Sequence, residues 1–222
     1  MTRILNSERK EALSGSTRSA VVFLHGYGAN GADLLGLADP LSEHLPDTLF
    51  IAPDAPETCV GSQFGFQWFH IPWIDGSAEE ESMRGMMAAA NDLNAFLDAL
   101  MVDEDLLPEQ VVLFGFSQGT MLALHIVPRR DDEIAGLVAF SGRLLEPDAL
   151  VDEVKSRPPI LLVHGDQDDV VPVQSLPAAV EGLEKADFKD VFAHIMKGTG
   201  HGIAPDGLSV ALAFIRDKLG FL

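Results

Sequence analysis

The sequence predicts an α/β fold, in which a mainly parallel central sheet carries helices on both faces. Short apolar, β-branched runs alternate along the chain with longer stretches of helical periodicity. The short runs are apolar at almost every position, as expected of parallel strands that are covered on both sides. The 222 residues contain no internal repeat or linker, so we expect one domain over residues 1–222.

Six runs are predicted to be strands, and helical patterns fall between them. The strands are expected at 19–24, 48–52, 110–114, 134–140, 159–163 and 190–196, and the helices at 31–45, 79–101, 120–127, 176–186 and 208–219. Three glutamates at 79–81 suit the positive end of the longest helix. Strand–helix alternation implies right-handed crossovers, and ligands in such sheets bind beyond the carboxyl ends of the strands.

The pentapeptide Gly115-Phe116-Ser117-Gln118-Gly119 stands between a predicted strand and a predicted helix. A G-x-S-x-G sequence in that position is typical of a nucleophile elbow. The turn is so tight that the residues flanking the serine have no room for a Cβ atom, and glycine meets that demand. We therefore expect Ser117 to be a nucleophile with its hydroxyl exposed above the edge of the sheet.

A nucleophilic serine needs a histidine base, and that histidine usually needs a carboxylate that holds its tautomer. In elbow enzymes the acid and then the histidine follow the serine along the chain. His201 lies in a glycine-rich loop between the last strand and the last helix, where it can reach Ser117. His194 lies inside a strand pattern and is expected to be structural. The predicted base is therefore His201.

The acid is expected in the segment that follows the strand at 159–163. Asp168 is the predicted acid, because the pattern H-G-x-x-D-x-x-V-P over 164–172 places its aspartate there. The neighbouring Asp169 is the alternative. Asp166 is expected instead to cap the turn through backbone N–H groups.

Two backbone N–H groups are predicted to stabilise a developing oxyanion. One belongs to Gln118, the residue after the nucleophile, at the start of the helix. The other is assigned to Tyr27, in the sequence His25-Gly26-Tyr27-Gly28 after the first predicted strand. His25 itself is expected to hold this loop through hydrogen bonds.

The connection over 53–77 is unusually long and rich in aromatic residues. Its side chains could line a pocket for an acyl or alcohol group, or they could simply cover the core at the edge of the domain. The residues predicted to bind substrate are Phe66, Trp68, Phe69 and Trp73.

Composition narrows the partners and the compartment. The net charge of −19 argues against nucleic acid and anionic membrane surfaces as partners. No apolar segment has the length of a membrane span or a signal peptide, so we expect a cytoplasmic protein without stable membrane insertion. The single cysteine, Cys59, cannot form an internal disulfide and agrees with a reducing compartment. No metal-ligand motif is present, so neither a metal nor an organic cofactor is expected.

Together these motifs resemble the phospholipase/carboxylesterase family of α/β-hydrolases, which includes bacterial carboxylesterases and eukaryotic acyl-protein thioesterases. The matching pieces run in family order over about residues 18–220. They are 23–28, 52–56, 67–69, 115–119, 140–142, 164–168 and 200–201. The segment 59–66 does not match the family pattern, so the preferred chain length stays open.

The resemblance implies an α/β-hydrolase fold without a large cap domain, and homodimers are frequent in the family. It also implies the triad Ser117, Asp168 and His201, with oxyanion donors at Tyr27 and Gln118. The expected activity is hydrolysis of short- to medium-chain acyl esters, small-molecule substrates, through an acyl-serine intermediate. An acyl-protein thioesterase or a lysophospholipase would use the same residues. A non-catalytic binding protein with this fold is the alternative from another class.

Overall fold

Seven strands form one sheet in the order β1-β3-β2-β6-β7-β8-β9. The structure is a computed structural model, and it describes residues 2–59, 61–62 and 64–221. Strand β1 pairs antiparallel with β3, and the other neighbours in this sheet are parallel. The predicted, mainly parallel sheet is therefore confirmed, with one antiparallel edge strand added.

The six predicted strands are present, and their ends differ by a few residues at most. The strands of the large sheet are β1 Ser7–Lys10, β2 Ser19–Leu24, β3 Thr48–Pro53, β6 Val111–Phe116, β7 Gly136–Phe140, β8 Ile160–Gly165 and β9 Val191–Met196. The sequence of β1 is polar and its residues are mostly exposed, so it carries no apolar strand pattern. Its backbone pairing with β3 is what makes it a strand.

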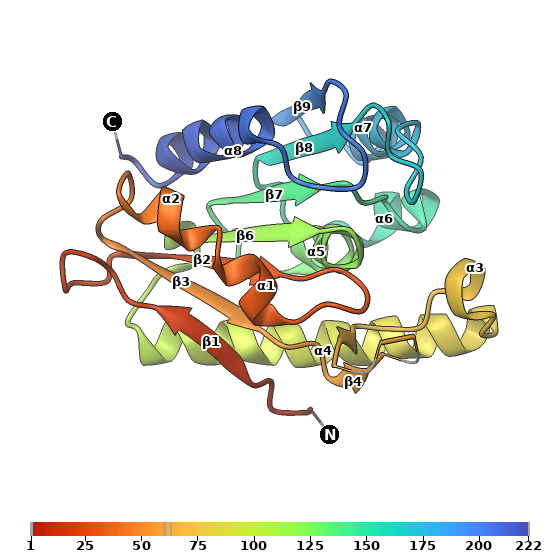
Figure 1. The fold of residues 1–222 in the computed structure, drawn as a ribbon, viewed down its shortest axis with the longest axis horizontal. Helices are drawn as coiled ribbons and strands as arrows, with labels where there is room; N and C mark the ends of the chain where they lie inside the picture. Colours follow the sequence, from red (N-terminus) through yellow and green to blue (C-terminus); the bar gives the residue numbers. More distant parts are fainter. Residues whose placement is uncertain (1, 60, 63, 222) are drawn as a thin grey trace.

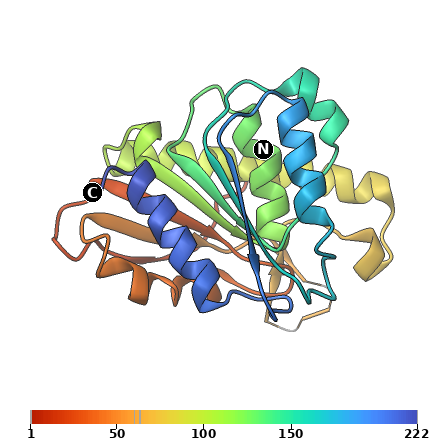
Figure 2. The same cartoon turned by 90° about the horizontal axis from the view of Figure 1, so that it is seen from above.

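Helices cover both faces of the sheet (Figures 1 and 2). The helices are α1 Gly31–Leu35, α2 Ala38–Ser42, α3 Pro72–Asp75, α4 Glu79–Asp103, α5 Gln118–Ile126, α6 Pro147–Glu153, α7 Ser175–Lys185 and α8 Pro205–Lys218, with 3₁₀ turns η1 Pro108–Gln110 and η2 Val127–Arg129. The single helix predicted over 31–45 is in fact two short helices, α1 and α2. Helices α3 and α6 were not predicted.

The core lies in two layers, one on each side of the sheet. Alternate residues of β2 show the division, because Val22 packs with the layer under α4 to α7 and Val21 with the layer under α1, α2 and α8. The expectation of strands buried on both faces is wrong for β9. Phe192 and Ile195 there are 45% and 47% exposed, since β9 is an edge strand.

The long connection after β3 holds small elements of its own. A two-stranded ribbon joins β4 Glu57–Thr58 to β5 Phe66–Gln67, and the short helix α3 follows. In Figure 1, α3 lies on the side of the molecule to which the arrowheads of β6 and β7 point. This connection therefore stands beside the carboxyl ends of the strands, and the part of it that the structure describes forms no separate cap domain.

None of the helices that the structure describes is both long enough and apolar enough to cross a bilayer.

Candidate active site

Ser117 occupies the sharp turn between β6 and α5. Its φ of 53° and ψ of −114° are unusual for a residue with a side chain, which is the strain expected of a nucleophile elbow. A Cβ atom on Gly115 would lie 2.7 Å from the backbone nitrogen of Thr120, and one on Gly119 would overlap the carbonyl oxygen of Leu24. The two glycines therefore allow the start of α5 to pack against the ends of β6 and β2.

His201 joins Ser117 to Asp168 in a continuous hydrogen-bonded chain. Its Nε2 lies 3.0 Å from Ser117 Oγ, and its Nδ1 lies 2.8 Å from Asp168 Oδ2. The ring of Phe116 packs beside the imidazole, with 5.0 Å between the ring centroids. An ionised carboxylate only accepts hydrogen bonds, so Nδ1 carries a proton and Nε2 is free to accept one from Ser117. The structure thus brings together the three residues that the sequence singled out, from the ends of three different strands.

Asp168 is held on both of its oxygens. Oδ1 accepts hydrogen bonds from the N–H groups of Val170 and Val171 at 3.0 and 2.8 Å. Burial raises the pKa of Asp168, but the hydrogen bond from His201 and those from Val171 and Val170 outweigh it, so the pKa lies below its ordinary value. The carboxylate is consequently ionised beside the imidazole. Asp169, the alternative acid, is exposed on the adjacent turn.

The loop after β2 lies directly against the serine. A Cβ atom on Gly26 would be 3.3 Å from the Cβ of Ser117, so only a small residue fits there without displacing the nucleophile. His25 donates from Nδ1 to the carbonyl oxygen of Gly26 at 2.8 Å and accepts at Nε2 from the N–H of Ala55 at 2.9 Å. Burial lowers the pKa of His25, which keeps it neutral for both bonds. The predicted structural role of His25 is confirmed.

The two predicted oxyanion donors are the N–H groups of Tyr27 and Gln118. Tyr27 follows Gly26, and Gln118 is the first residue of α5. Neither N–H group donates a hydrogen bond to another residue that the structure describes. Their role in catalysis stays a prediction.

The side chain of Gln118 makes two hydrogen bonds that were not expected from the sequence. Its Oε1 accepts the N–H of Trp68 at 2.9 Å, and its Nε2 donates to the carbonyl oxygen of Phe69 at 2.6 Å. Gln118 is fully buried, and these two hydrogen bonds tie the long connection after β3 to the elbow. No local pattern signals this contact, because its partners lie about fifty residues earlier in the chain.

Two of the four aromatic residues predicted to bind substrate belong to the core instead. Trp68 and Phe69 are 0% and 1% exposed, and both pack in the layer under α4 to α7. The indole N–H of Trp68 donates to the carbonyl oxygen of His25 at 2.9 Å and so holds the loop after β2. The prediction for these two was wrong because a buried aromatic residue and a pocket-lining one have the same sequence pattern. Phe66 and Trp73 keep accessible surface, so their contact with substrate stays a prediction.

The helix α3 is fixed by one buried carboxylate. Asp75 accepts from the N–H groups of Ile71 and Ser77 at 3.1 and 2.9 Å, and His70 Nδ1 lies 3.0 Å from its Oδ2. Burial raises the pKa of Asp75, but the hydrogen bonds from Ser77, His70 and Ile71 outweigh this effect and lower the pKa to about 2. Trp73 on this helix stacks with Arg143, whose Cζ is 5.1 Å from the ring centroid. The helix therefore contacts the loop that follows β7.

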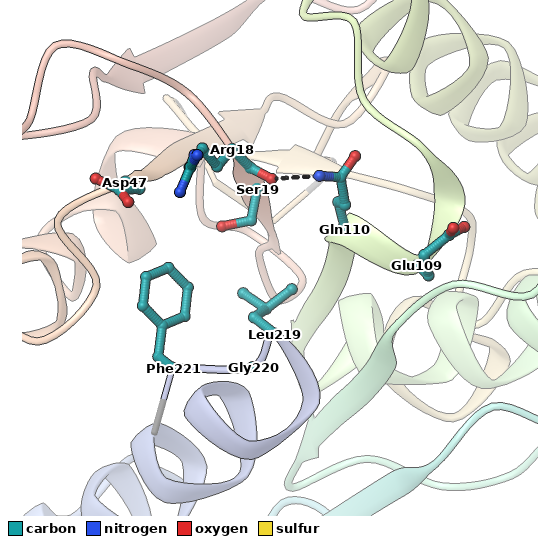
Figure 3. A pocket seen from close by; sticks show the side chains of 8 residues that line it. All are labelled: Arg18, Ser19, Asp47, Glu109, Gln110, Leu219, Gly220 and Phe221. Carbon is teal, nitrogen blue, oxygen red and sulfur yellow. Dashed lines mark hydrogen bonds between the residues drawn. The ribbon is translucent and has the colours of Figure 1, made fainter.

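Ser117, Asp168 and His201 lie at the carboxyl edge of the sheet, as expected for a site on a parallel sheet. A separate cavity of about 450 Å³ lies at the opposite edge, near the C-terminus (Figure 3). Ser19 at the start of β2 lines it, and Gln110, just before β6, donates to the carbonyl oxygen of Arg18 at 2.9 Å. This cavity takes no part in the triad. Across the described residues, no three His, Cys, Asp or Glu side chains cluster as metal ligands would.

Known proteins are similar to this chain over nearly its whole length. The model of a family described as phospholipase/carboxylesterase matches residues 7–219. The chain is 30% identical over 226 residues to acyl-protein thioesterase 1 of Saccharomyces cerevisiae, which covers 97% of this chain and 99% of that protein.

Two solved structures are similar over nearly the full length of both chains. The crystal structure of esterase PE8 superposes with a TM-score of 0.92 at 40% identity, covering 98% of this chain and all of that one. Acyl-protein thioesterase 2 of Zea mays superposes with a TM-score of 0.78 at 25% identity, covering 97% and 99%. The similarity therefore extends over nearly the whole fold.

Proposed function

Because the chain belongs to the phospholipase/carboxylesterase family and is a hydrolase of carboxylic esters, we propose that Ser117, His201 and Asp168 perform the hydrolysis. The observation that carries the proposal is the unbroken chain of hydrogen bonds from Ser117 Oγ through both imidazole nitrogens to Asp168 Oδ2. Each bond has the polarity that general-base catalysis needs, since the serine can donate to Nε2 while Nδ1 donates to the carboxylate.

The reaction proceeds through an acyl-serine. Ser117 Oγ attacks the carbonyl carbon of the ester, and its proton passes to His201 Nε2. Negative charge on the carbonyl oxygen is stabilised by the N–H groups of Tyr27 and Gln118, and the positive end of α5 adds to this effect. His201 then returns the proton to the departing alcohol. Water repeats the sequence on the acyl-serine and releases the acid.

The substrates we propose are short- to medium-chain acyl esters of small alcohols. Of the four residues predicted to bind substrate, Phe66 and Trp73 remain accessible for an acyl or alcohol group. The hydrogen bonds of Gln118 to Trp68 and Phe69 hold the same connection against the elbow, which supports this assignment. Thioesters and lysophospholipids are substrates that the same residues could hydrolyse.

The proposal is tested with Ser117→Ala, using p-nitrophenyl butyrate hydrolysis and labelling by a fluorophosphonate probe. We expect the variant to lose both while retaining the circular dichroism spectrum of the wild type. Ser209→Ala, at an exposed serine of α8, is the matched control and should react as the wild type does. Hydrolysis by Ser117→Ala at the wild-type rate would contradict the assignment. Failure of the wild type to react with either reagent would support a non-catalytic binding protein.

Substrate preference is measured separately. A rate profile over acyl esters of increasing chain length, each with its matched thioester, gives the acyl and leaving-group preferences together. Faster cleavage of long-chain thioesters than of short-chain esters would favour the thioesterase alternative.

We also propose a cytoplasmic location and a homodimer. The free, buried Cys59 supports a reducing compartment. The exposed apolar residues Phe192 and Ile195 on the edge strand β9 support association through that edge. Cell fractionation and light scattering during size-exclusion chromatography test these two proposals.

A further inference from the structure

A second histidine contacts the acid of the triad. His164 lies in β8, four residues before Asp168, and is only 2% exposed. Its Nε2 is 2.8 Å from the carbonyl oxygen of Val171 and 3.3 Å from Asp168 Oδ2. The mechanism above gives this imidazole no role, although it lies against the same carboxylate oxygen as His201.

The tautomer of His164 follows from its partners. A carbonyl oxygen can only accept a hydrogen bond, so Nε2 must carry the proton that it shares with Val171. The same Nε2 lies 3.3 Å from Asp168 Oδ2, where it makes a close polar contact while its N–H bonds to Val171. The positive end of the N–H dipole therefore lies beside the carboxylate of Asp168.

His164 also holds Asp168 indirectly, through the backbone of Val171. The N–H of Val171 donates to Asp168 Oδ1 at 2.8 Å, while the carbonyl oxygen of Val171 is fixed by His164. Both oxygens of the carboxylate thus depend on the imidazole, Oδ2 through the 3.3 Å contact and Oδ1 through Val171. Rotation of the carboxylate away from His201 would break both contacts.

Among the residues that the structure describes, Asp168 is the carboxylate within 4 Å of His164. A cavity of about 10 Å³ lies beside the ring, and it is lined by uncharged residues of α5, α7, β7 and β8, which include Thr120, Leu124 and Leu176. His201, for its part, faces Ser117 and the ring of Phe116 besides Asp168. Asp168 is therefore the charged group that both histidines share.

We propose that His164 is a positioning residue for the acid of the triad, directing Asp168 Oδ2 toward His201 by its Nε2–H and by its bond to Val171. The inference rests on the proposed triad. Because the N–H dipole of His164 lies beside the carboxylate, it also offsets part of the negative charge that would otherwise stabilise protonated His201. Loss of the imidazole should loosen the alignment of Asp168 and so lower kcat. While the bond from His201 to Asp168 persists, the loss should also leave more negative charge on the carboxylate, which favours the protonated, inactive form of the base.

Two variants distinguish the effect of losing the N–H donor from the effect of changing the side-chain volume. His164→Leu removes the donor, whereas His164→Gln places an amide N–H the same number of bonds from Cβ as Nε2. We measure kcat and KM for p-nitrophenyl butyrate, and the rate of fluorophosphonate labelling, across the pH range. Thermal unfolding is recorded for each protein.

We expect His164→Leu to lower kcat by about tenfold, with KM unchanged, since His164 does not reach the substrate. The acidic limb of the kcat/KM profile and of the labelling rate should move to higher pH by about half a unit. His164→Gln should restore the position of the limb and most of kcat. His125→Leu, at a buried histidine at the far end of α5, is the matched control and should change unfolding without moving the limb.

The proposal is overturned if His164→Leu folds and keeps the wild-type kcat and profile. It is also overturned if kcat falls equally in the Leu and Gln variants without movement of the acidic limb, because the role would then be structural. If the wild type does not react with fluorophosphonate, both the proposed triad and this inference are wrong. If the wild type reacts and His164→Leu keeps the wild-type kcat and pH profile, only this inference is wrong.

The wild type supplies a measurement that needs no variant. Two-dimensional proton–nitrogen NMR of the histidine rings reports which nitrogen carries the proton. We expect His164 to be protonated at Nε2, and a ring protonated at Nδ1 alone would overturn the proposal.

Discussion

The contact between Gln118 and the long connection after β3 leads to a quantitative prediction. In Gln118→Met, a side chain of similar size replaces the amide, so both hydrogen bonds disappear without a large cavity. The N–H of Trp68 and the carbonyl oxygen of Phe69 then remain buried without these partners. Each buried, unpaired group costs about 1–3 kcal/mol, so the free energy of unfolding should fall by about 2–6 kcal/mol.

For a domain of this length, 1 kcal/mol corresponds to a shift in Tm of about 2–4 °C. Gln118→Met should therefore unfold roughly 4–24 °C below the wild type in a calorimetric scan. The Tm of Gln118→Ala should be lower still, because this variant loses the same two hydrogen bonds and also leaves a cavity. A Tm of Gln118→Met equal to that of the wild type would refute the reasoning, since the two hydrogen bonds would then contribute nothing to stability.

The same variant distinguishes the side chain of Gln118 from its backbone. The proposed oxyanion donor is the main-chain N–H, which Gln118→Met retains. Residual esterase activity should therefore far exceed that of Ser117→Ala at a temperature where both proteins are folded. Equal loss of kcat in the two variants would mean that the amide side chain itself takes part in the reaction.

Three further outcomes are expected. Asp168→Asn should lower kcat by about 10⁴-fold, because the amide favours the wrong tautomer of the histidine, while Asp169→Asn should remain near the wild-type rate; a larger loss in Asp169→Asn would identify that residue as the acid. Gly119→Ala should lose its native circular dichroism spectrum, because the new Cβ would overlap the carbonyl oxygen of Leu24, and a wild-type spectrum would contradict this. Asp75→Asn should lose about 2 kcal/mol of unfolding free energy at neutral pH in urea. That contribution arises because the pKa of Asp75 is about 2 when folded and near 3.8 when unfolded. It is complete above the unfolded value and disappears as the pH falls through the folded one, so an unchanged difference at low pH would contradict it.

The predictable part of the fold is the part with local, repeating patterns. The interior strands are buried on both faces, so each shows as an apolar run, as in 19–24 and 159–163. Strand β1 has no such run, because a single antiparallel pairing at the edge defines it. The predicted helix at 31–45 failed for a similar reason, since its apolar residues serve two short helices that pack on one face of the sheet.

The candidate site shows the same division. The tight elbow requires Gly115 and Gly119, and those residues identify Ser117 without any knowledge of the tertiary structure. Chain order and the motif around Asp168 then led to the acid and to His201. The aromatic residues of the long connection offered no comparable constraint, so Trp68 and Phe69 were assigned to the pocket although they form core.

The sequence alone therefore determined the α/β sheet and the three residues joined by hydrogen bonds, because tight turns and buried strands restrict which residues can occupy them. Only the tertiary structure decided which residues brace those three. Gln118 holds the connection after β3, and His164 lies against Asp168, through contacts that depend on which side chains the folded sheet brings together. The contacts of Gln118 leave no local pattern, since they join groups about fifty residues apart. His164, Asp168 and Val171 share one short motif, but only the folded turn shows which of their atoms meet.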